Sequence, residues 1–489
     1  MDRDVFWGAR TVFFGEADHG KSTLMGYLYA ESQKEDLDKH KEELKMVMGS
    51  AYNDDDRYLY SSLISPIVPV TEGGLQRFSS KRRQLRDFVV DGPDPLVITM
   101  IDTPGHSRYL HHQEYGAARG KIGVFCLYIG SVLSNNFDIS FIDRRTRLWF
   151  AANPYLKLII TLTQFDRENY NEDAYLTAKN KIESCLNPSK IKAIIPIAID
   201  FRKRCGHNIF ALSEKTPWYI GLCLIKAIEE QWYTIANMQS NEHLLPKNLV
   251  FSVDREFPRP LSHAGKIWRI YVENGELSNG KEIQLTSVEV KSDESVSTKE
   301  LTSSVSAVVK EFRFDVCIGD EDELEESTSC KGSAVTINLK DCYAGRDKIN
   351  KRQVFTTSQT VGLSKDEPFS LKNQICIRFE VPEDILNLST KTLEFEKTNQ
   401  EIILLIFGRG IPATITKISD DYTKVFVNLF SDKQITIPND ENLRSLDIFR
   451  RVIVRFQDGL VRIPCSDGSF REEPSFAYLP ARIIYDETD

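Results

Sequence analysis

Residues 15–23 read Gly-Glu-Ala-Asp-His-Gly-Lys-Ser-Thr, which matches the phosphate-loop pattern G-x-x-x-x-G-K-[ST]. An apolar run at residues 11–14 precedes the stretch, and residues 24–29 have the composition to begin a helix. Between a strand and a helix, successive backbone N–H groups cradle phosphate oxygens. The pattern therefore predicts that Lys21 reaches the β- and γ-phosphates of a nucleotide and that the Ser22 hydroxyl binds Mg²⁺. Taken alone, the motif leaves open an accidental glycine-rich turn.

The composition predicts a globular chain of several domains. Its 489 residues exceed what one hydrophobic core usually holds, and about three domains are expected. The 62 basic and 71 acidic residues give a formal net charge of −9, which argues against nucleic-acid binding through overall positive charge. No apolar run is long enough to span a bilayer, so no membrane partner is expected. Nine cysteines without a C-x-x-C pair indicate reduced thiols in the cytosol or nucleus.

A second motif, Asp-Thr-Pro-Gly-His at residues 102–106, follows the phosphate loop in the chain. The polar residues between 24 and about 65 are expected to form a helical insertion on the surface. Two strand-like runs at 88–90 and 96–101 then predict a hairpin. Asp102 would end the second strand and contact Mg²⁺, while Gly105 leaves room for its N–H beside the γ-phosphate.

Further apolar runs occur at residues 122–129, 156–162 and 194–199. Asp166 follows the second of these runs, where a carboxylate accepts hydrogen bonds from N1 and N2 of guanine. Strands, loops and helices alternate, which predicts a doubly wound α/β P-loop G domain. After residue 247 the helical period disappears and short alternating strands predict two β-barrels. The expected domains are a G domain at 1–235 and β-barrels at 247–363 and 364–489.

These motifs resemble those of translational GTPases over nearly the whole chain. Residues 15–23 are similar to the family's G-H-V-D-H-G-K-[ST]-T, residues 102–106 to its D-[AT]-P-G-H, and residues 265–280 to a strand pair of its second domain. The closest branch contains elongation factor 1-alpha and the release and ribosome-rescue factors. Residues 206–209 and 217–221 resemble that branch's G-D-N-[MIL] and P-W-[YF]-x-G.

The resemblance implies GTP and Mg²⁺ as ligands. It implies Ser22 and Asp102 as the metal-binding residues and His106 as the catalytic residue that orients the attacking water. The nucleotide-binding residues that it implies are Asp18, His19, Gly20, Lys21, Ser22, Thr23, Gly105, Thr163, Gln164, Asp166 and Ala198.

The chain also departs from the family pattern. The base-reading N-K-x-D reads Thr-Gln-Phe-Asp at residues 163–166, and Ala198-Ile199 replaces the usual S-[AG]. Ala17 replaces a valine that forms part of a gate near the attacking water. In the first switch, Gln76 aligns with a threonine that binds Mg²⁺. Gln164 is expected to replace some of the lysine stem that normally packs on the base.

The residues that contact phosphate are retained, whereas several residues that the family uses for hydrolysis are replaced. This combination favours a GTP-binding adaptor with weak or absent hydrolysis. The resemblance points to adaptors that recognise stalled ribosomes in cytoplasmic non-stop mRNA decay. The implied partners are the ribosome and, mainly through an N-terminal extension, the exosome and the superkiller complex. The chain, expected to be monomeric, would then be a C-terminal fragment.

Three alternatives remain open at this point. One is an active elongation, termination or rescue GTPase that hydrolyses GTP on the ribosome. Another is the related GTPase subunit of sulfate adenylyltransferase, which usually keeps the full N-K-x-D. The last is an α/β protein that has lost nucleotide binding.

Overall fold

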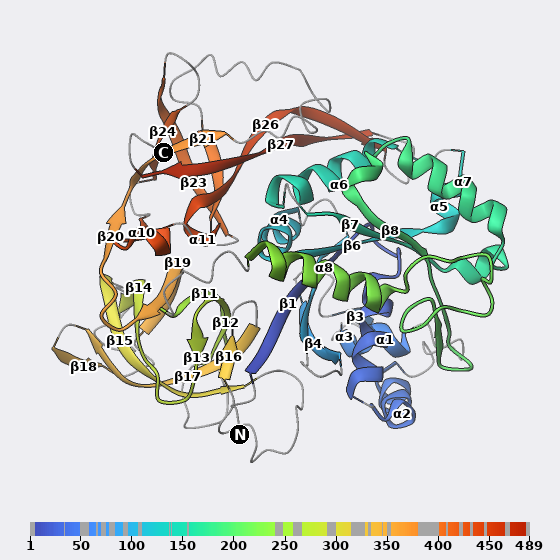
Figure 1. The fold of residues 1–489 in the computed structure, drawn as a ribbon, viewed down its shortest axis with the longest axis horizontal. Coiled ribbons are helices and arrows are strands. Elements are labelled where there is room, and N and C mark those ends of the chain that lie inside the picture. Colours follow the sequence, from blue (N-terminus) through green and yellow to red (C-terminus); the bar gives the residue numbers. More distant parts are fainter. Residues whose placement is uncertain are drawn as a thin grey trace. The chain divides into compact units, whose positions relative to one another are not determined.

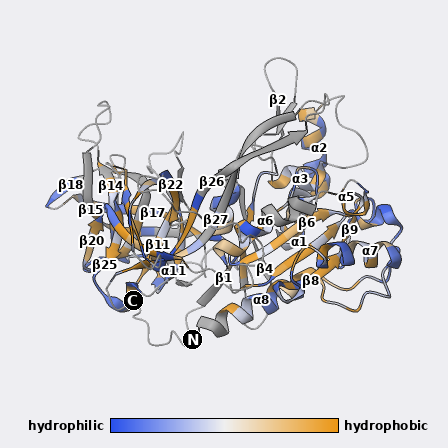
Figure 2. Ribbon diagram, turned by 90° about the horizontal axis from the view of Figure 1, so that it is seen from above, coloured by the Kyte–Doolittle hydropathy of each residue, from blue (hydrophilic) through white to orange (hydrophobic). Residues whose placement is uncertain are grey.

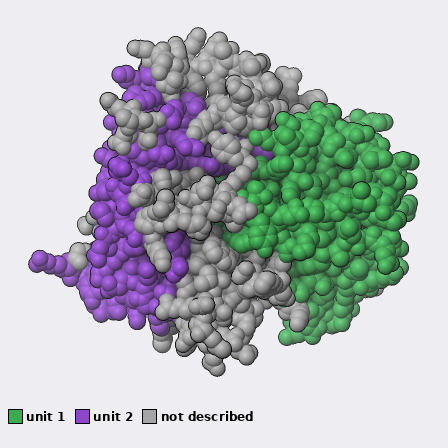
Figure 3. Space-filling view, viewed as in Figure 1, with its two compact units in different colours: residues 1–146, 155–244, 313–334 green, residues 147–154, 245–312, 335–489 purple. Residues whose placement is uncertain are grey.

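The computed structural model forms two compact units, one of residues 1–146, 155–244 and 313–334 and the other of residues 147–154, 245–312 and 335–489 (Figure 3). No helix in the described part of the chain is long and apolar enough to cross a membrane. The structure describes residues 5–33, 35–48, 58–64, 67–69, 75–77, 84–90, 96–105, 110–135, 137, 139–153, 156–239, 248–257, 267–290, 300–313, 328–330, 334–344, 346–349, 354–379, 401–406, 409–419, 424–430, 434–444, 447–464 and 470–485.

The first unit is built on a largely parallel sheet (Figure 1). Across the sheet, its strands are β4 (Gln84–Val90), β5 (Leu96–Asp102), β1 (Val5–Phe14), β6 (Ile122–Tyr128), β7 (Leu158–Thr163) and β8 (Ile191–Pro196). Only β4 runs antiparallel to its neighbour β5 among these pairs, which confirms the predicted hairpin. A short strand, β16 (Thr328–Cys330), pairs in parallel with the first residues of β1.

Helices alternate with these strands, as the sequence predicts for an α/β domain. They are α1 (Lys21–Gln33), α4 (Leu110–Arg119), α5 (Ile129–Leu133), α6 (Ile139–Ala152), α7 (Glu172–Glu183) and α8 (Leu224–Gln239). Every residue of β7 is buried, because a central parallel strand is covered on both faces. Figure 2 shows the same contrast, with apolar colouring on the central strands and hydrophilic colouring on much of α7.

The helical insertion lies on the surface only in part. Of the twelve residues of α2 (Leu37–Met48) only Leu37, Leu44 and Met48 are buried, as expected for a surface helix, but the expectation was wrong for α3 (Leu59–Ile64), where five of the six residues are buried. The Ser62 hydroxyl donates to the Leu59 carbonyl at 2.9 Å, which satisfies a polar group inside the core. A buried helix of six residues is too short to show a clear apolar period. Because the residues around it are mostly polar, the sequence did not indicate that α3 is buried.

The second unit contains two closed barrels, as predicted. The first consists of β12 (Ile267–Asn274), β11 (Val250–Phe257), β19 (Val354–Ser364), β14 (Glu282–Val290), β15 (Glu300–Arg313) and β17 (Ala334–Ala344), and it closes through pairing of β17 with β12. The second consists of β21 (Gln374–Phe379), β24 (Val425–Leu429), β23 (Arg409–Ile418), β22 (Glu401–Ile406), β26 (Arg451–Pro464) and β27 (Phe470–Ile484). Closure pairs each of these described barrel strands on both sides, while β18 (Asp347–Ile349) adds a short strand beside β17.

The two barrels share a hydrophobic cluster and a polar seam. Val361 and Leu363 of the first barrel belong to the same buried cluster as Leu404 of the second. The hydroxyls of Thr286 on β14 and of Thr436 lie 2.7 Å apart and are buried; Thr436 belongs to β25 (Ile435–Pro438), which pairs with β20 (Phe369–Lys372) beside the second barrel. The expected boundaries at residues 235, 247, 363 and 364 remain predictions.

Gly26 permits the close packing of α1 on α3. A Cβ built at Gly26 would lie 1.9 Å from the carbonyl oxygen of Tyr60. Glycine-to-alanine changes in exposed helices stabilise by about 1 kcal/mol, but this clash should reverse the sign. We expect Gly26→Ala to lower the free energy of unfolding by about 1–3 kcal/mol in urea titrations.

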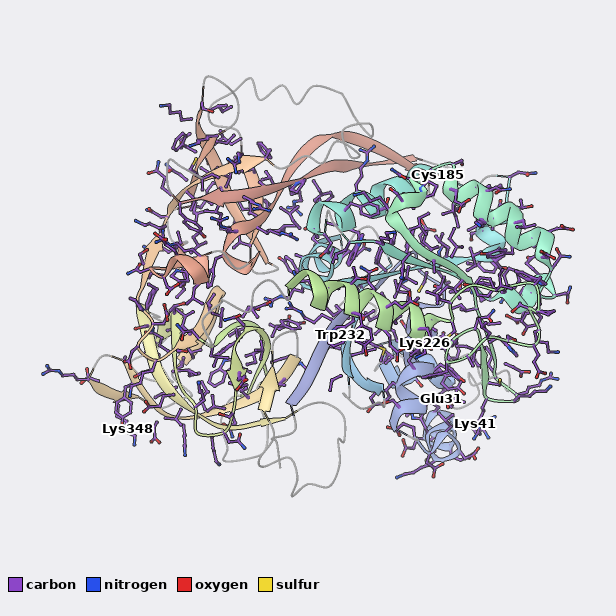
Figure 4. The ribbon with its side chains drawn as sticks, viewed as in Figure 1. Glu31, Lys41, Cys185, Lys226, Trp232 and Lys348 are labelled. Carbon is purple, nitrogen blue, oxygen red and sulfur yellow. The ribbon has the colours of Figure 1, made fainter. Side chains whose placement is uncertain are left out.

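The exposed Glu31, on the same helix and labelled in Figure 4, provides the control. Glu31→Ala should change the free energy of unfolding by less than about 0.5 kcal/mol. A Gly26→Ala protein as stable as the wild type would contradict this account of the packing.

Candidate nucleotide-binding site

The loop between β1 and α1 is held in a shape that requires glycine at Gly15. This residue has a φ of 144°, and a Cβ there would lie 2.3 Å from the carbonyl oxygen of Cys126 on β6. Asp18 and Gly20 also have positive φ values, 62° and 79°. The ring Nδ1 of the buried His19 lies 3.3 Å from the same Cys126 oxygen. The loop therefore folds tightly over the end of the neighbouring strand.

Three of the predicted phosphate and metal residues come together at this loop. Lys21 is only 6% exposed, and its ammonium donates to the carbonyl oxygen of Glu16. The Ser22 hydroxyl donates to Oδ2 of Asp102 at 3.0 Å. Asp102 ends β5, opposite Phe13 near the end of β1. Adjacent parallel strands thus bring together residues that lie 80 positions apart in the chain.

The turn after Asp102 packs directly on the phosphate loop. The Thr103 hydroxyl donates to the carbonyl of Phe13 at 2.8 Å, and the buried Gln113 amide donates to the carbonyl of Pro104. A Cβ on Gly105 would lie 2.2 Å from the backbone nitrogen of Ala17, so only glycine fits there. The role of Gln113 could not be predicted from the sequence, because nothing in its helix indicates this contact.

For two other predicted site residues, His106 and Gln76, the structure describes no side chain. His106 lies outside the described residues. Gln76 lies on β3 (Leu75–Arg77), which pairs with β2 (Ile67–Pro69), but its side chain is not among the described ones.

The donor set fits a hard cation such as Mg²⁺. The metal favours oxygen ligands and is usually held by one or two protein groups plus phosphate oxygens. The Ser22 hydroxyl and the Asp102 carboxylate lie within hydrogen-bond distance of each other. They would hold the ion, and the ion would supply positive charge next to the phosphates.

Thr163 and Gln164, at the end of β7, contact the phosphate loop. The buried Thr163 hydroxyl lies 2.9 Å from the His19 carbonyl oxygen and 3.2 Å from that of Leu127. The Gln164 amide nitrogen donates to the carbonyl of Asp18 at 3.1 Å. The amide end of the Gln164 side chain is thus bonded to the loop, and its expected packing on the base stays a prediction.

Asp166 and Ala198 lie on two loops that meet beside the phosphate loop. Asp166 is exposed on the 3-10 helix η3 (Phe165–Glu168), and Ala198 is buried at the start of β9 (Ala198–Asp200). The Phe165 N–H donates to the Ile197 carbonyl at 3.1 Å and joins the two loops. An exposed carboxylate on this anchored turn is available to accept hydrogen bonds from a purine base.

The Asn208 side chain holds the loop after β10 (Cys205–His207) in place through hydrogen bonds. It is fully buried, and its side-chain nitrogen donates to the Pro196 carbonyl at 2.7 Å and to the Thr216 hydroxyl at 2.9 Å. Its oxygen accepts from the Ser213 N–H at 2.8 Å. The Gly-His-Asn-Ile motif at residues 206–209 is visible in the sequence, but these hydrogen bonds of Asn208 are not.

Tyr27 connects α1 to the same region. Its hydroxyl oxygen accepts a hydrogen bond from the Gly206 N–H at 2.8 Å. Burial and the Glu31 carboxylate raise the pKa of Tyr27 to about 12, so the phenol stays neutral near pH 7. Burial lowers the pKa of the nearby His207, which favours a neutral ring.

Comparison with known proteins agrees with this geometry. The family described as the elongation factor Tu GTP binding domain matches residues 9–337. Elongation factor 1-alpha of Methanosarcina acetivorans is 25% identical over 274 residues, which cover 55% of this chain and 58% of that protein. The homologue from Methanothermobacter thermautotrophicus is 23% identical and covers 45% of this chain and 47% of its own. The chain thus spans about half the length of these relatives.

Solved structures show a similar fold. The Ski7 GTPase-like domain of S. cerevisiae, bound to GDP and inorganic phosphate, has a TM-score of 0.61 at 12% identity and 98% coverage of both chains. The same domain bound to GTP has a TM-score of 0.60 at 13% identity and 98% coverage of both chains. A bacterial selenocysteine-specific elongation factor, EF-Sec, has a TM-score of 0.51 at 15% identity and covers 99% of this chain and 58% of its own. At these identities the similarity concerns the fold.

The Asn208 brace gives a pH-dependent prediction. Asn208→Asp replaces the amide donors by a carboxylate that faces the Pro196 carbonyl oxygen. Burial should raise the pKa of the introduced carboxyl in the folded state above its unfolded value of about 4. The destabilisation caused by the charged carboxylate should therefore be largest at pH 7, where we expect the free energy of unfolding to fall by about 2–4 kcal/mol. It should become smaller as the pH falls toward 4.

Urea unfolding of the wild type and the variant at pH 5 and pH 7 measures this difference. Asn208→Ala is the control, because it removes the same hydrogen bonds without adding a titrating group. A stability gap between Asn208→Asp and Asn208→Ala that does not change with pH would contradict the assignment.

Proposed function

The chain belongs to the family of the elongation factor Tu GTP-binding domain, and from this premise we propose that it is a GTP-binding adaptor with weak or absent hydrolysis. The observation that carries the proposal is the cluster of Lys21, Ser22 and Asp102 at the phosphate loop. This cluster supports phosphate binding, whereas the substitutions nearby affect positions that the family uses for turnover.

Electrostatics support a triphosphate as the ligand. A buried ammonium is costly unless negative or polar groups surround it, and Lys21 is almost fully buried at the start of α1. The N-terminus of a helix adds a partial positive charge next to the loop. Phosphate oxygens would accept hydrogen bonds from the Lys21 ammonium and from the N-terminus of α1. Mg²⁺ held by Ser22 and Asp102 would balance the remaining negative charge of the phosphates.

The altered residues support weak hydrolysis. GTP hydrolysis in this superfamily depends on positioning of the attacking water and on electrostatic stabilisation. Ala17 replaces the gate valine and removes apolar surface from that region. Gln76 replaces the switch threonine, and its longer side chain alters the metal-facing geometry.

The more specific role that we propose is an adaptor that recognises stalled ribosomes in cytoplasmic mRNA surveillance, with partners in the exosome and superkiller complexes. It rests on the motif resemblance of the sequence. The likeness to the Ski7 GTPase-like domain supports the shared fold. The second candidate is an active GTPase of translation. One observation favours it: His106 is retained in the sequence.

Purification with bound nucleotide tests the proposal. The protein should copurify with, or take up, one equivalent of GTP, identified by mass spectrometry, and the GTP should persist during incubation with Mg²⁺. Lys21→Ala removes the charge-assisted hydrogen bonds and should weaken GTP binding by about 100-fold or more.

Lys226→Ala provides the matched control. Lys226 is an exposed lysine on α8, paired with Glu229 and visible in Figure 4. Its removal should leave GTP binding unchanged. A wild-type protein without nucleotide affinity would refute the proposal, and rapid conversion of bound GTP to GDP would favour the second candidate.

A further inference from the structure

We propose that His40 makes the docking of α2 on α3 depend on pH, because proton uptake by its ring weakens the contact between the two helices. In the chain, both helices lie between α1, which begins at the phosphate loop, and β3, which carries Gln76 of the first switch. The insertion is thus a proton-sensitive element that leads into the first switch. This role of His40 does not depend on nucleotide binding.

His40 lies on the buried face of α2. The buried residues of this helix are Leu37, Leu44 and Met48, whose spacing of seven and four puts them on one face. His40 follows Leu37 by three positions and precedes Leu44 by four, so it belongs to the same face. Its side chain is only 20% exposed. The face with which α2 docks therefore holds one titratable ring in an otherwise apolar row.

The hydrogen bond to α3 determines which ring nitrogen of His40 carries the hydrogen. Nε2 lies 2.8 Å from the Ser62 hydroxyl oxygen. Ser62 donates its only hydrogen to the Leu59 carbonyl at 2.9 Å, so its oxygen accepts from the ring. We therefore assign the hydrogen of the neutral ring to Nε2. The lone pair of Nδ1 is then the place where a further proton binds.

Few charges are available to stabilise a protonated His40 ring. Nδ1 lies 3.9 Å from Oε2 of Glu43, whose side chain is 60% exposed, and Glu35 is the other carboxylate whose charge acts on the ring. The described ranges of α3 and β2, which border α2, contain no charged residue, since they read Leu-Tyr-Ser-Ser-Leu-Ile and Ile-Val-Pro. An exposed carboxylate stabilises a nearby charge only weakly. The cost of placing an imidazolium in an apolar face therefore prevails.

The direction of the pH effect follows from this balance. Burial lowers the pKa of His40, against the opposing effect of Glu43 and Glu35, from an ordinary value of about 6.5. When α2 leaves α3, the ring becomes hydrated and regains the ordinary value. The undocked helix then binds more protons below about pH 6.5, so docking weakens as the pH falls through this range. At pH 7.5 the ring is neutral in both states and docking is at its full strength.

Hydrogen exchange of the α2 amides, measured on the whole chain without nucleotide at pH 7.5 and pH 5.5, tests the proposal. The rates are divided by the intrinsic exchange rates at each pH and compared with those of α7 in the same sample. We expect the protection of α2 relative to α7 to fall several-fold at pH 5.5. The upper limit is about 10-fold, because a ring of ordinary pKa is protonated about ten to one at that pH.

Two substitutions at the same position separate the charge of the ring from its packing. His40→Gln keeps an amide donor for the Ser62 oxygen but does not titrate, so α2 should remain protected equally at both pH values. His40→Leu continues the apolar row of α2 and should also remove the pH effect.

His207→Gln is the matched control. His207 lies 2.8 Å from the Ser213 hydroxyl oxygen through Nδ1, and burial lowers the pKa of its ring as well. It belongs to β10 and not to the insertion. Its replacement should leave the pH effect on α2 as it is in the wild type.

The proposal is overturned if α2 of the wild type is equally protected at both pH values, or if His40→Gln and His40→Leu keep the pH effect. Loss of the effect in His207→Gln would also overturn it, because the proton would then act elsewhere. If α2 is unprotected at pH 7.5 in both His40 variants, the neutral ring is not what permits docking, and the proposal is wrong. Since no nucleotide is present, none of these outcomes depends on the proposed GTP binding.

Discussion

The nucleotide site depends on hydrogen bonds that fix the carbonyl groups of the phosphate loop. A loop that presents successive N–H groups to a ligand must direct the carbonyls of the same peptides elsewhere. Thr163 and Gln164 receive the carbonyls of His19 and Asp18 at the end of β7. Because β1, β6 and β7 are adjacent parallel strands, their carboxyl ends lie at one edge of the sheet. The strand order therefore brings the loop and the residues that hold it together.

The same sheet edge explains how two distant motifs form one site. Asp102 ends the strand next to β1, and the Thr103 hydroxyl donates to the carbonyl of Phe13 near the end of β1. Gly105 then approaches the backbone of Ala17 more closely than any side chain would allow. A retained glycine here is consistent with a loop whose phosphate-binding shape is preserved even though nearby positions differ from the family pattern.

Much of this arrangement could be predicted from the sequence. The phosphate-loop spacing, the buried strand before it and Asp102 after a second strand are local patterns with a physical cause, and the barrels follow from regular alternation. The roles of Thr163 and Asn208 could not be predicted, because each depends on a partner that only the fold brings near. Thr163 meets His19 across 144 positions, and Asn208 is buried by a loop without an apolar period. The burial of α3 was missed because six residues give no clear periodicity.

We propose that the domain holds GTP and turns it over slowly or not at all. The most direct test is multiple-turnover phosphate release measured with and without ribosomes, for the wild type and for His106→Ala. We predict slow release that ribosomes do not accelerate and that His106→Ala does not change. Release that ribosomes stimulate strongly, and that disappears in His106→Ala, would contradict the account.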